Sequence, residues 1–121
     1  MPVSTIISTE KRSVRLLSAL LLLAFFLTSC GPSQKELSIG ALKHFRRGNQ
    51  LFTNNNPRGA AEEYRMAIAL DDQQSVFYFN LGLAYYKLVL YEHAIDAYQT
   101  AIAQNPNFSE AWYNLSLALD K

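Results

Sequence analysis

The chain repeats itself with a period of 34 residues, and no other feature restricts its possible folds as strongly. When the sequence is shifted by 34 positions, residues 60–69 align with residues 94–103, and five of the ten positions are identical. The same shift aligns residues 78–85 with residues 112–119, where four of eight positions agree. A unit that recurs at such a period buries its apolar face by stacking on its neighbours. The sequence therefore predicts a stack of repeated units.

The unit from residue 75 to residue 108 resembles a tetratricopeptide repeat along its whole length, and this family builds each repeat from two antiparallel helices. The matching residues are Tyr78, Leu81, Gly82 and Tyr85 in the first helix, Ala94, Tyr98 and Ala101 in the second, and Pro106 at the end. The small residues Gly82, Ala94 and Ala101 are expected where the two helices cross, because their size lets the backbones approach closely. Pro106 cannot continue a helix, so the chain is expected to turn there.

The units on either side match the family less completely. Residues 41–74 keep Gly48 and Tyr64, but His44, Arg47 and Asp72 replace the family's aromatic, leucine and proline. A terminal repeat turns one face to water, so polar replacements are expected there. Residues 109–121 can supply one helix only, which makes them a partial third repeat or a capping helix. The resemblance therefore implies an all-α fold, a short right-handed solenoid of about two and a half repeats.

Five helices are expected, over about residues 34–53, 57–70, 75–89, 91–104 and 109–121. Asn56 followed by Pro57 indicates the N-cap and the first position of the second helix. The segment from Ser33 to Glu36 fits a capping box that opens the first helix. Nothing after residue 30 alternates with a period of two, so no strand is predicted.

The first thirty residues differ in composition from the rest. Lys11, Arg12 and Arg15 form a basic region, and an apolar stretch from residue 16 to residue 27 follows, interrupted only by Ser18. Twelve helical residues extend about 18 Å, which is short of the roughly 30 Å hydrocarbon core of a bilayer. A basic region before a short apolar region is typical of a secretory signal.

The sequence from Leu27 to Cys30, Leu-Thr-Ser-Cys, resembles the lipobox of bacterial lipoproteins, and Cys30 is the only cysteine of the chain. The resemblance implies that residues 1–29 are a removed signal peptide and that Cys30 becomes the lipidated first residue. Residues 30–40 are then a short tether and helix lead-in. If the organism is diderm, Gly31 favours the outer membrane, facing the periplasm, because many diderm bacteria use aspartate at this position for inner-membrane retention. An uncleaved signal anchor is the alternative.

The composition argues against catalysis, metal binding and nucleic-acid binding. A formal charge of +1 gives no electrostatic footprint for nucleic acid, and one cysteine with two histidines gives no zinc cluster. No nucleophile–base pair or phosphate loop occurs, so we expect no enzyme, no cofactor and no small-molecule substrate. His44 is expected as a partly exposed packing residue and His93 as a surface residue. The pairs 62–63 and 71–72 are expected to be solvated carboxylates.

In the tetratricopeptide family the first helices of the repeats line a concave groove that holds an extended peptide or a partner helix. The candidate groove residues at the corresponding positions are Phe45, Asn49, Phe52, Phe79, Asn80, Tyr86, Tyr113 and Asn114. Aromatic rings with a few amides are typical of a protein-binding surface. Some members clamp a C-terminal carboxylate with two asparagines and three cations. Asn49 and Asn80 match those asparagines, but Phe45, Glu110 and Asn114 stand where the cations belong, so this clamp is not predicted.

The two resemblances together predict a membrane-anchored adaptor or assembly scaffold of the bacterial cell envelope, which binds a protein or peptide partner in its groove. The alternative is a structural subunit that self-associates or completes a larger complex through its repeat ends, where Trp112 and Leu115 need a neighbour.

Overall fold

The computed structural model describes residues 14–18, 20 and 31–121, and it divides the chain into two units, Met1–Ser33 and Gln34–Lys121. In the first unit, residues 14–18 are helical and exposed. Most of the expected signal peptide, the lipobox and Cys30 itself lie outside the described residues. Within the described part, no helix combines the length with the apolar character that crossing a membrane requires.

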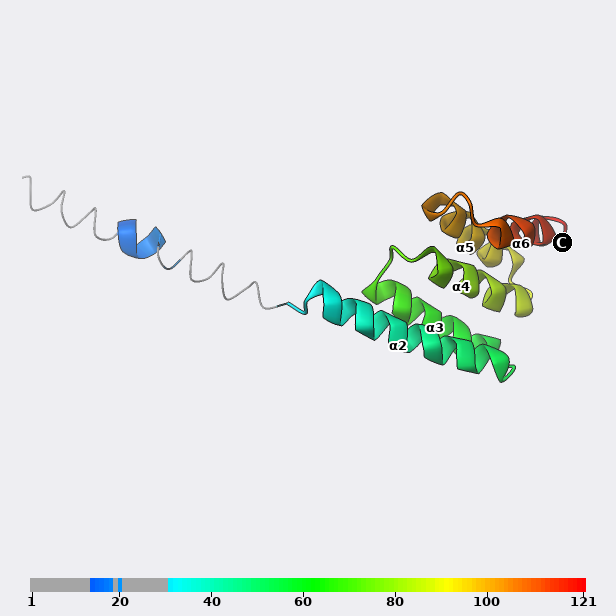
Figure 1. Cartoon of the computed structure of the whole chain (residues 1–121), viewed down its shortest axis with the longest axis horizontal. Helices are drawn as coiled ribbons and strands as arrows, with labels where there is room; N and C mark the ends of the chain where they lie inside the picture. Colours follow the sequence, from blue (N-terminus) through cyan, green and yellow to red (C-terminus); the bar gives the residue numbers. More distant parts are fainter. Residues whose placement is uncertain (1–13, 19, 21–30) are drawn as a thin grey trace, which may run out of the picture. The chain divides into compact units, whose positions relative to one another are not determined.

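The second unit consists of helices that pack in chain order (Figure 1). Their bounds are α2 Gln34–Thr53, α3 Pro57–Leu70, α4 Ser75–Lys87, α5 Tyr91–Gln104 and α6 Ser109–Leu119. Helices α2 and α3 form one hairpin, α4 and α5 form the next, and α6 packs on α5 with a smaller contact to α4. The described residues contain no strand, and the predicted all-α solenoid is confirmed.

The helix ends follow from local chemistry. Asn56 accepts a hydrogen bond from the backbone N–H of Gly59 over 3.0 Å, and Pro57 opens α3, as expected for an N-cap followed by proline. Helix α4 ends two residues earlier than the sequence predicts. There the N–H of Leu88 donates to the carbonyl of Ala84, and Val89 adopts a left-handed conformation with a φ of 63°. Helix α6 likewise ends at Leu119 instead of residue 121.

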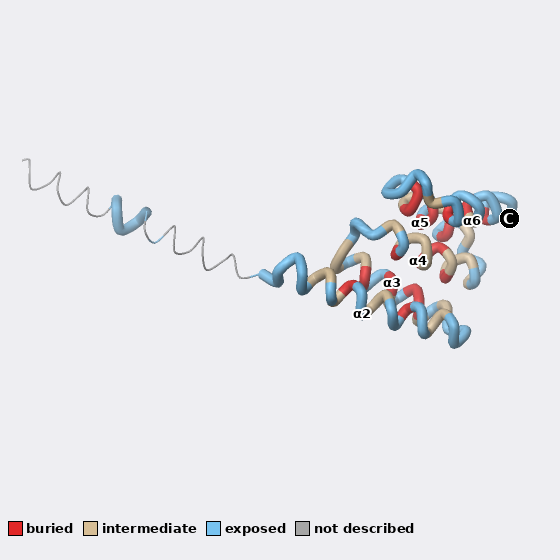
Figure 2. The backbone as a smooth tube through the Cα atoms, in the orientation of Figure 1, coloured by how far each residue is buried: buried red, intermediate tan, exposed pale blue. Residues whose placement is uncertain are grey.

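The core is built from tyrosine rings that lie on glycines of the partner helix. A Cβ atom added to Gly82 would lie 2.5 Å from Cε1 of Tyr98, and one added to Gly48 would lie 2.5 Å from Cε1 of Tyr64. Both tyrosines are fully buried, together with alanines such as Ala94. Figure 2 shows that the buried residues lie along the helix faces that meet one another. The predicted close crossing at Gly82 is therefore present, and it recurs in both hairpins.

Candidate partner-binding face

The first helices of the three units, α2, α4 and α6, are linked by aromatic contacts. The ring of Phe45 in α2 lies 4.8 Å from the ring of Phe77 in α4, measured between centroids. The ring of Phe79 in α4 lies 4.7 Å from that of Phe108, which precedes α6. These contacts join α2 to α4, and α4 to the residue before α6. The candidate residues of these three helices are called here the first-helix row.

Three of the candidate aromatic residues use part of their surface to complete the core. Phe45 also contacts Tyr64, with centroids 5.8 Å apart, and Phe79 contacts Tyr98 at 6.0 Å. Tyr86 meets Tyr91 edge-on; their centroids are 5.3 Å apart. The rings of Phe45, Phe79 and Tyr86 are half-buried as a result. A partner could therefore contact only part of each ring.

Two amides of the row form hydrogen bonds within their own helices. The Nδ2 group of Asn80 donates to the carbonyl of Val76 over 2.9 Å, and that of Asn114 donates to the carbonyl of Glu110 over 2.7 Å. Each bond stays within its own helix and spans four residues, so the two asparagines, 34 residues apart, have the same arrangement. A carboxamide has two donor hydrogens and an acceptor oxygen, so further hydrogen-bonding capacity is left for a partner.

Tyr113 is the open aromatic ring of the row, since 64% of its surface is exposed. It lies next to Asn114 in the sequence and occupies the repeat position that Phe45 and Phe79 hold in the preceding units.

Asn49 supports the core instead, because its Oδ1 accepts a hydrogen bond from the Tyr64 hydroxyl over 2.8 Å. Burial raises the pKa of Tyr64 to about 12.

Lys87 joins the row although sequence reasoning did not select it. Its Nζ lies 4.9 Å from the ring centroid of Phe52, which is half-buried at the end of α2. A lysine over an aromatic face is attracted by the ring quadrupole. The sequence feature that could have pointed to Lys87 is its position in the last turn of α4, where a cation also interacts favourably with the helix dipole. The contact supplies a cation to a row that otherwise holds aromatic rings and amides.

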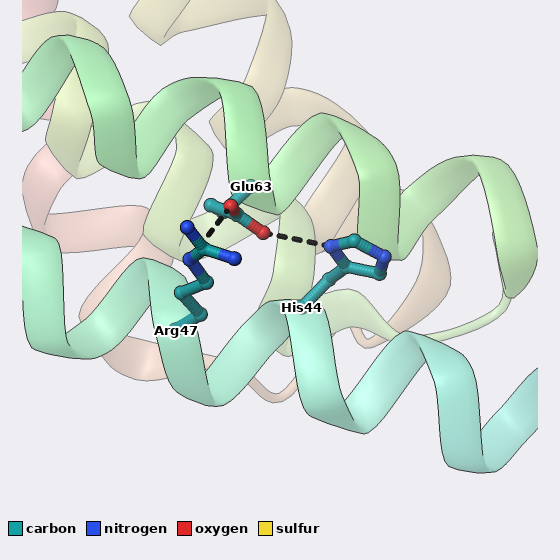
Figure 3. A network of polar contacts seen from close by, with 3 residues as sticks. All are labelled: His44, Arg47 and Glu63. Atoms are coloured by element: carbon teal, nitrogen blue, oxygen red, sulfur yellow. Dashed lines mark hydrogen bonds and ion pairs between the residues drawn. The ribbon is translucent and has the colours of Figure 1, made fainter.

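One predicted surface carboxylate is part of a polar network between α2 and α3 (Figure 3). Glu63 contacts Nδ1 of His44 over 2.7 Å and Nε of Arg47 over 3.2 Å. Only 16% of the Glu63 side chain is exposed, so the expectation that it is solvated was wrong. The reason is that Glu63 lies on the side of α3 that faces α2. Its neighbour Glu62 is exposed beside Arg65, as expected.

This network joins helices and has the composition of a structural contact. His44 is partly exposed, as predicted, and His93 is exposed with its ring 5.4 Å from that of Tyr85. Among residues 14–18, 20 and 31–121, no group of histidine, cysteine and carboxylate side chains has the arrangement of a metal site.

Helical hairpins with a tyrosine packed on a glycine, repeated every 34 residues, define a helical-repeat protein of the solenoid class. Family comparison identifies the repeat. A tetratricopeptide repeat model matches residues 75–108, a TPR repeat model matches residues 48–89, and a further tetratricopeptide repeat model matches residues 97–121. The chain is therefore a tetratricopeptide-repeat protein.

Curated relatives include an assembly factor. The chain is 30% identical over 87 residues to the photosystem I assembly protein Ycf3 of Acaryochloris marina, covering 69% of this chain and 52% of that protein. It is 32% identical over 65 residues to the inactive TPR repeat-containing thioredoxin TTL3 of Arabidopsis thaliana, covering 54% of this chain and 9% of that protein. The chain thus spans about half of the first relative and a small part of the second.

Solved structures of similar fold include peptide complexes. The second TPR of Spaghetti (RPAP3) bound to an HSP90 peptide has a TM-score of 0.70 and 28% identity, covering 72% of this chain and 80% of that one. The TPR2B domain of yeast Sti1, in a complex with an Hsp70 peptide, has a TM-score of 0.66 and 27% identity, covering 67% and 65%. MamA has a TM-score of 0.65 and 30% identity, covering 66% and 47%.

Proposed function

We propose that this chain is a non-catalytic adaptor that binds an extended segment of a partner protein along its first-helix row and is held at a bacterial envelope membrane by lipid on Cys30. The observation that carries the proposal is the shared geometry of Asn80 and Asn114, each bonded within its own helix and beside an aromatic residue. Amides at a regular spacing can bind a peptide backbone whatever its side chains are.

The comparisons support peptide binding as the class of activity. Spaghetti (RPAP3) and Sti1 have similar folds and were solved with HSP90 and HSP70 peptides, and Ycf3 is named an assembly protein. The charge pattern of this chain argues against binding the free carboxyl end of a peptide, as the carboxylate clamp does. Glu110 stands at a position where the carboxylate clamp of the family uses a cation, so a free C-terminal carboxylate would meet repulsion.

The membrane part of the proposal rests on the sequence. A basic region, a short apolar region and Leu27-Thr28-Ser29-Cys30 occur in the order that a lipoprotein signal requires. A protein that carries two or more acyl chains is held firmly at a bilayer. The adaptor would therefore work on partners at the membrane surface, with the outer membrane favoured by Gly31.

A crosslinking pull-down with the detergent-solubilised full chain tests the adaptor proposal. The variant carrying Asn80→Ala and Asn114→Ala should recover at least ten-fold less partner than the native chain, since each amide that is lost leaves a partner group unpaired at a cost of about 1 kcal/mol or more. Asn107→Ala, at an exposed site outside the row, is the matched control. Equal recovery by all three chains, with equal melting curves, would reject the first-helix row as the binding site.

The second candidate function is self-association through the last helix. Trp112 and Leu119 of α6 are 53% and 63% exposed, although the corresponding residues of α4 are half-buried. A second copy that covered α6 would remove this apolar surface from water. Light scattering of the chain in detergent separates the candidates: a monomer supports the adaptor, and a concentration-dependent dimer that Trp112→Ala abolishes supports the structural subunit.

A further inference from the structure

The outward face of α2 is the most basic surface of the repeat unit. Helix α2 carries Lys35, Lys43, Arg46 and Arg47 against the single carboxylate Glu36, a net charge of +3. Residues 71–121 carry two lysines against six carboxylates, a net charge of −4. Positive charge is thus concentrated at the first helix, and negative charge is spread over the later ones.

Most of these cations have no carboxylate partner among the described residues. Arg47 pairs with Glu63, whereas Lys43 and Arg46 have no ion pair within the part of the chain that the structure describes. Both are exposed, and with Ile39, Arg47 and Gln50 they line a shallow hollow on the outside of the helix. Because no carboxylate of the described residues pairs with Lys43 or Arg46, both present a positive potential to anything that approaches α2.

Apolar side chains lie among the cations. Ile39 is 59% exposed, and the exposed Leu42 lies three residues further along the helix. A helix face that combines exposed apolar residues with lysine and arginine is the composition that lies in the headgroup region of a bilayer.

The position of α2 in the chain brings this face close to the proposed anchor. Helix α2 begins at Gln34, four residues after Cys30. Four residues reach at most about 14 Å when fully extended. A lipid on Cys30 would therefore keep the first turn of α2 near the headgroups, within one or two Debye lengths of about 8 Å.

We propose that the face formed by Ile39, Leu42, Lys43 and Arg46 docks on the anionic phospholipid headgroups of the membrane that holds Cys30. This inference rests on the proposed lipid anchor and deepens it by giving the anchored domain a fixed orientation. Each helix packs mainly on its chain neighbours, so α6 lies farthest from α2 along the stack. Docking through α2 would cover the α2 end of the first-helix row and leave Tyr113 and Asn114, at its α6 end, accessible to a partner.

Polarity-sensitive labelling of single cysteines tests the docking. Cys30 is the only native cysteine, and its thiol is consumed by the lipid, so Ile39→Cys gives one labelling site on the face. Leu119→Cys on α6, 63% exposed, is the matched control site. The full processed chain is reconstituted into vesicles of phosphatidylcholine alone and into an equal mixture of phosphatidylcholine and phosphatidylglycerol.

We expect the emission maximum of the label at residue 39 to move to shorter wavelength in the anionic vesicles only. This shift should disappear at high salt. The label at residue 119 should not respond. Lys43→Gln with Arg46→Gln should weaken the response about twenty-five-fold, since each cation near an anionic surface contributes about a five-fold effect. Arg58→Gln with Lys121→Gln removes the same charge elsewhere and should leave the response intact.

The outcomes separate the docking from the anchor. Vesicle flotation together with a blocked Cys30 thiol reports the anchor, and the label spectrum reports the face. Flotation with identical spectra in both vesicle types would overturn the docking and keep the anchor. A free thiol without flotation would overturn the anchor, and the docking would fall as well unless added anionic vesicles still shift the label. A shift produced by envelope proteins and not by anionic vesicles would assign the face to a protein partner and overturn the proposal.

Discussion

The hydroxyl of the buried Tyr64 donates a hydrogen bond to Oδ1 of Asn49 over 2.8 Å, and the second repeat lacks this bond. One period later Tyr98 replaces Tyr64, but Leu83 stands in place of Asn49 and packs against the cluster that contains Tyr98. The Tyr98 hydroxyl is buried and has no hydrogen-bond partner among the residues that the structure describes. Two tyrosines with the same fold position therefore differ in whether their hydroxyl is satisfied.

The same mutation should have opposite effects at these two sites. Tyr64→Phe removes a hydrogen bond, so the free energy of unfolding should fall by about 0.5–1.5 kcal/mol. Tyr98→Phe removes a buried hydroxyl that pays a desolvation penalty without a bond, so the free energy of unfolding should stay equal or rise by about 1 kcal/mol. Urea unfolding followed by circular dichroism measures both.

A third variant checks the explanation. Leu83→Asn gives Tyr98 the acceptor that Asn49 gives Tyr64, and it should be better tolerated in the native chain than in the Tyr98→Phe background. If Tyr98→Phe proves as destabilising as Tyr64→Phe, the Tyr98 hydroxyl has a bonding partner, and the proposed difference between the repeats is incorrect.

The glycine–tyrosine contacts predict a sharp size limit. In Gly48→Ala and Gly82→Ala the new methyl group would lie about 2.5 Å from a fully buried ring. Overpacking of this kind should lower the free energy of unfolding by about 1–3 kcal/mol, a large part of the roughly 5–10 kcal/mol expected for a domain of this size. The melting temperature of each variant measures the loss.

Gly40→Ala is the matched control in the same helix as Gly48. Its methyl group would meet only Cδ1 of Leu70, at 3.1 Å, and the end of a leucine side chain can move. Alanine also favours a helix over glycine by about 0.5–1 kcal/mol, so this variant should be neutral or slightly stabilising. Equal losses in all three variants would show that helix geometry, and not the tyrosine contact, sets the cost.

Local signals in the sequence were sufficient for the helices and their pairing. The 34-residue period located both hairpins, and Asn56-Pro57 fixed the start of α3 to the residue. Gly82 could be assigned to a close helix crossing because the repeat signature requires a small residue at that position. The end of α4 was missed by two residues, because Val89 in a left-handed conformation carries no recognisable signal in its side chain.

The candidate face was less predictable, since side-chain partners depend on contacts between helices. Glu63 was expected to be solvated, yet it contacts His44 and Arg47 on α2. Lys87 was overlooked because its partner Phe52 belongs to another repeat. A period identifies which positions share a face, but the residue across the helix interface decides whether a side chain there is free.

Cys30→Ser should abolish membrane attachment, since a serine hydroxyl cannot form the thioether that the lipobox resemblance implies. Metabolic labelling with a fatty acid, followed by detergent phase partition, should find the native chain labelled and the variant unlabelled. Cleavage after residue 29 should also fail, leaving the precursor mass in whole-protein mass spectrometry. Label and partition that are unchanged in Cys30→Ser would exclude lipidation at this residue.

The buried tyrosines predict a loss of stability at alkaline pH. Burial raises the pKa of Tyr64 to about 12. The pKa of Tyr98 is raised further, mainly by burial and to a smaller extent by the nearby Tyr86. In the unfolded chain both groups ionise near pH 10. Above that pH the unfolded chain has released these protons while the folded chain retains them, so the free energy of unfolding falls as the pH rises from 10 towards the folded values.

Between pH 10 and pH 12 the loss should reach about 2–3 kcal/mol for Tyr64 alone, because one pKa unit corresponds to about 1.4 kcal/mol. Urea unfolding at several alkaline pH values measures the slope. Tyr64→Phe, although less stable at neutral pH, should show a shallower decline above pH 10 than the native chain. Parallel declines in the native chain and in Tyr64→Phe would mean that Tyr64 ionises in the folded state as readily as in the unfolded one, which its burial against Gly48 contradicts.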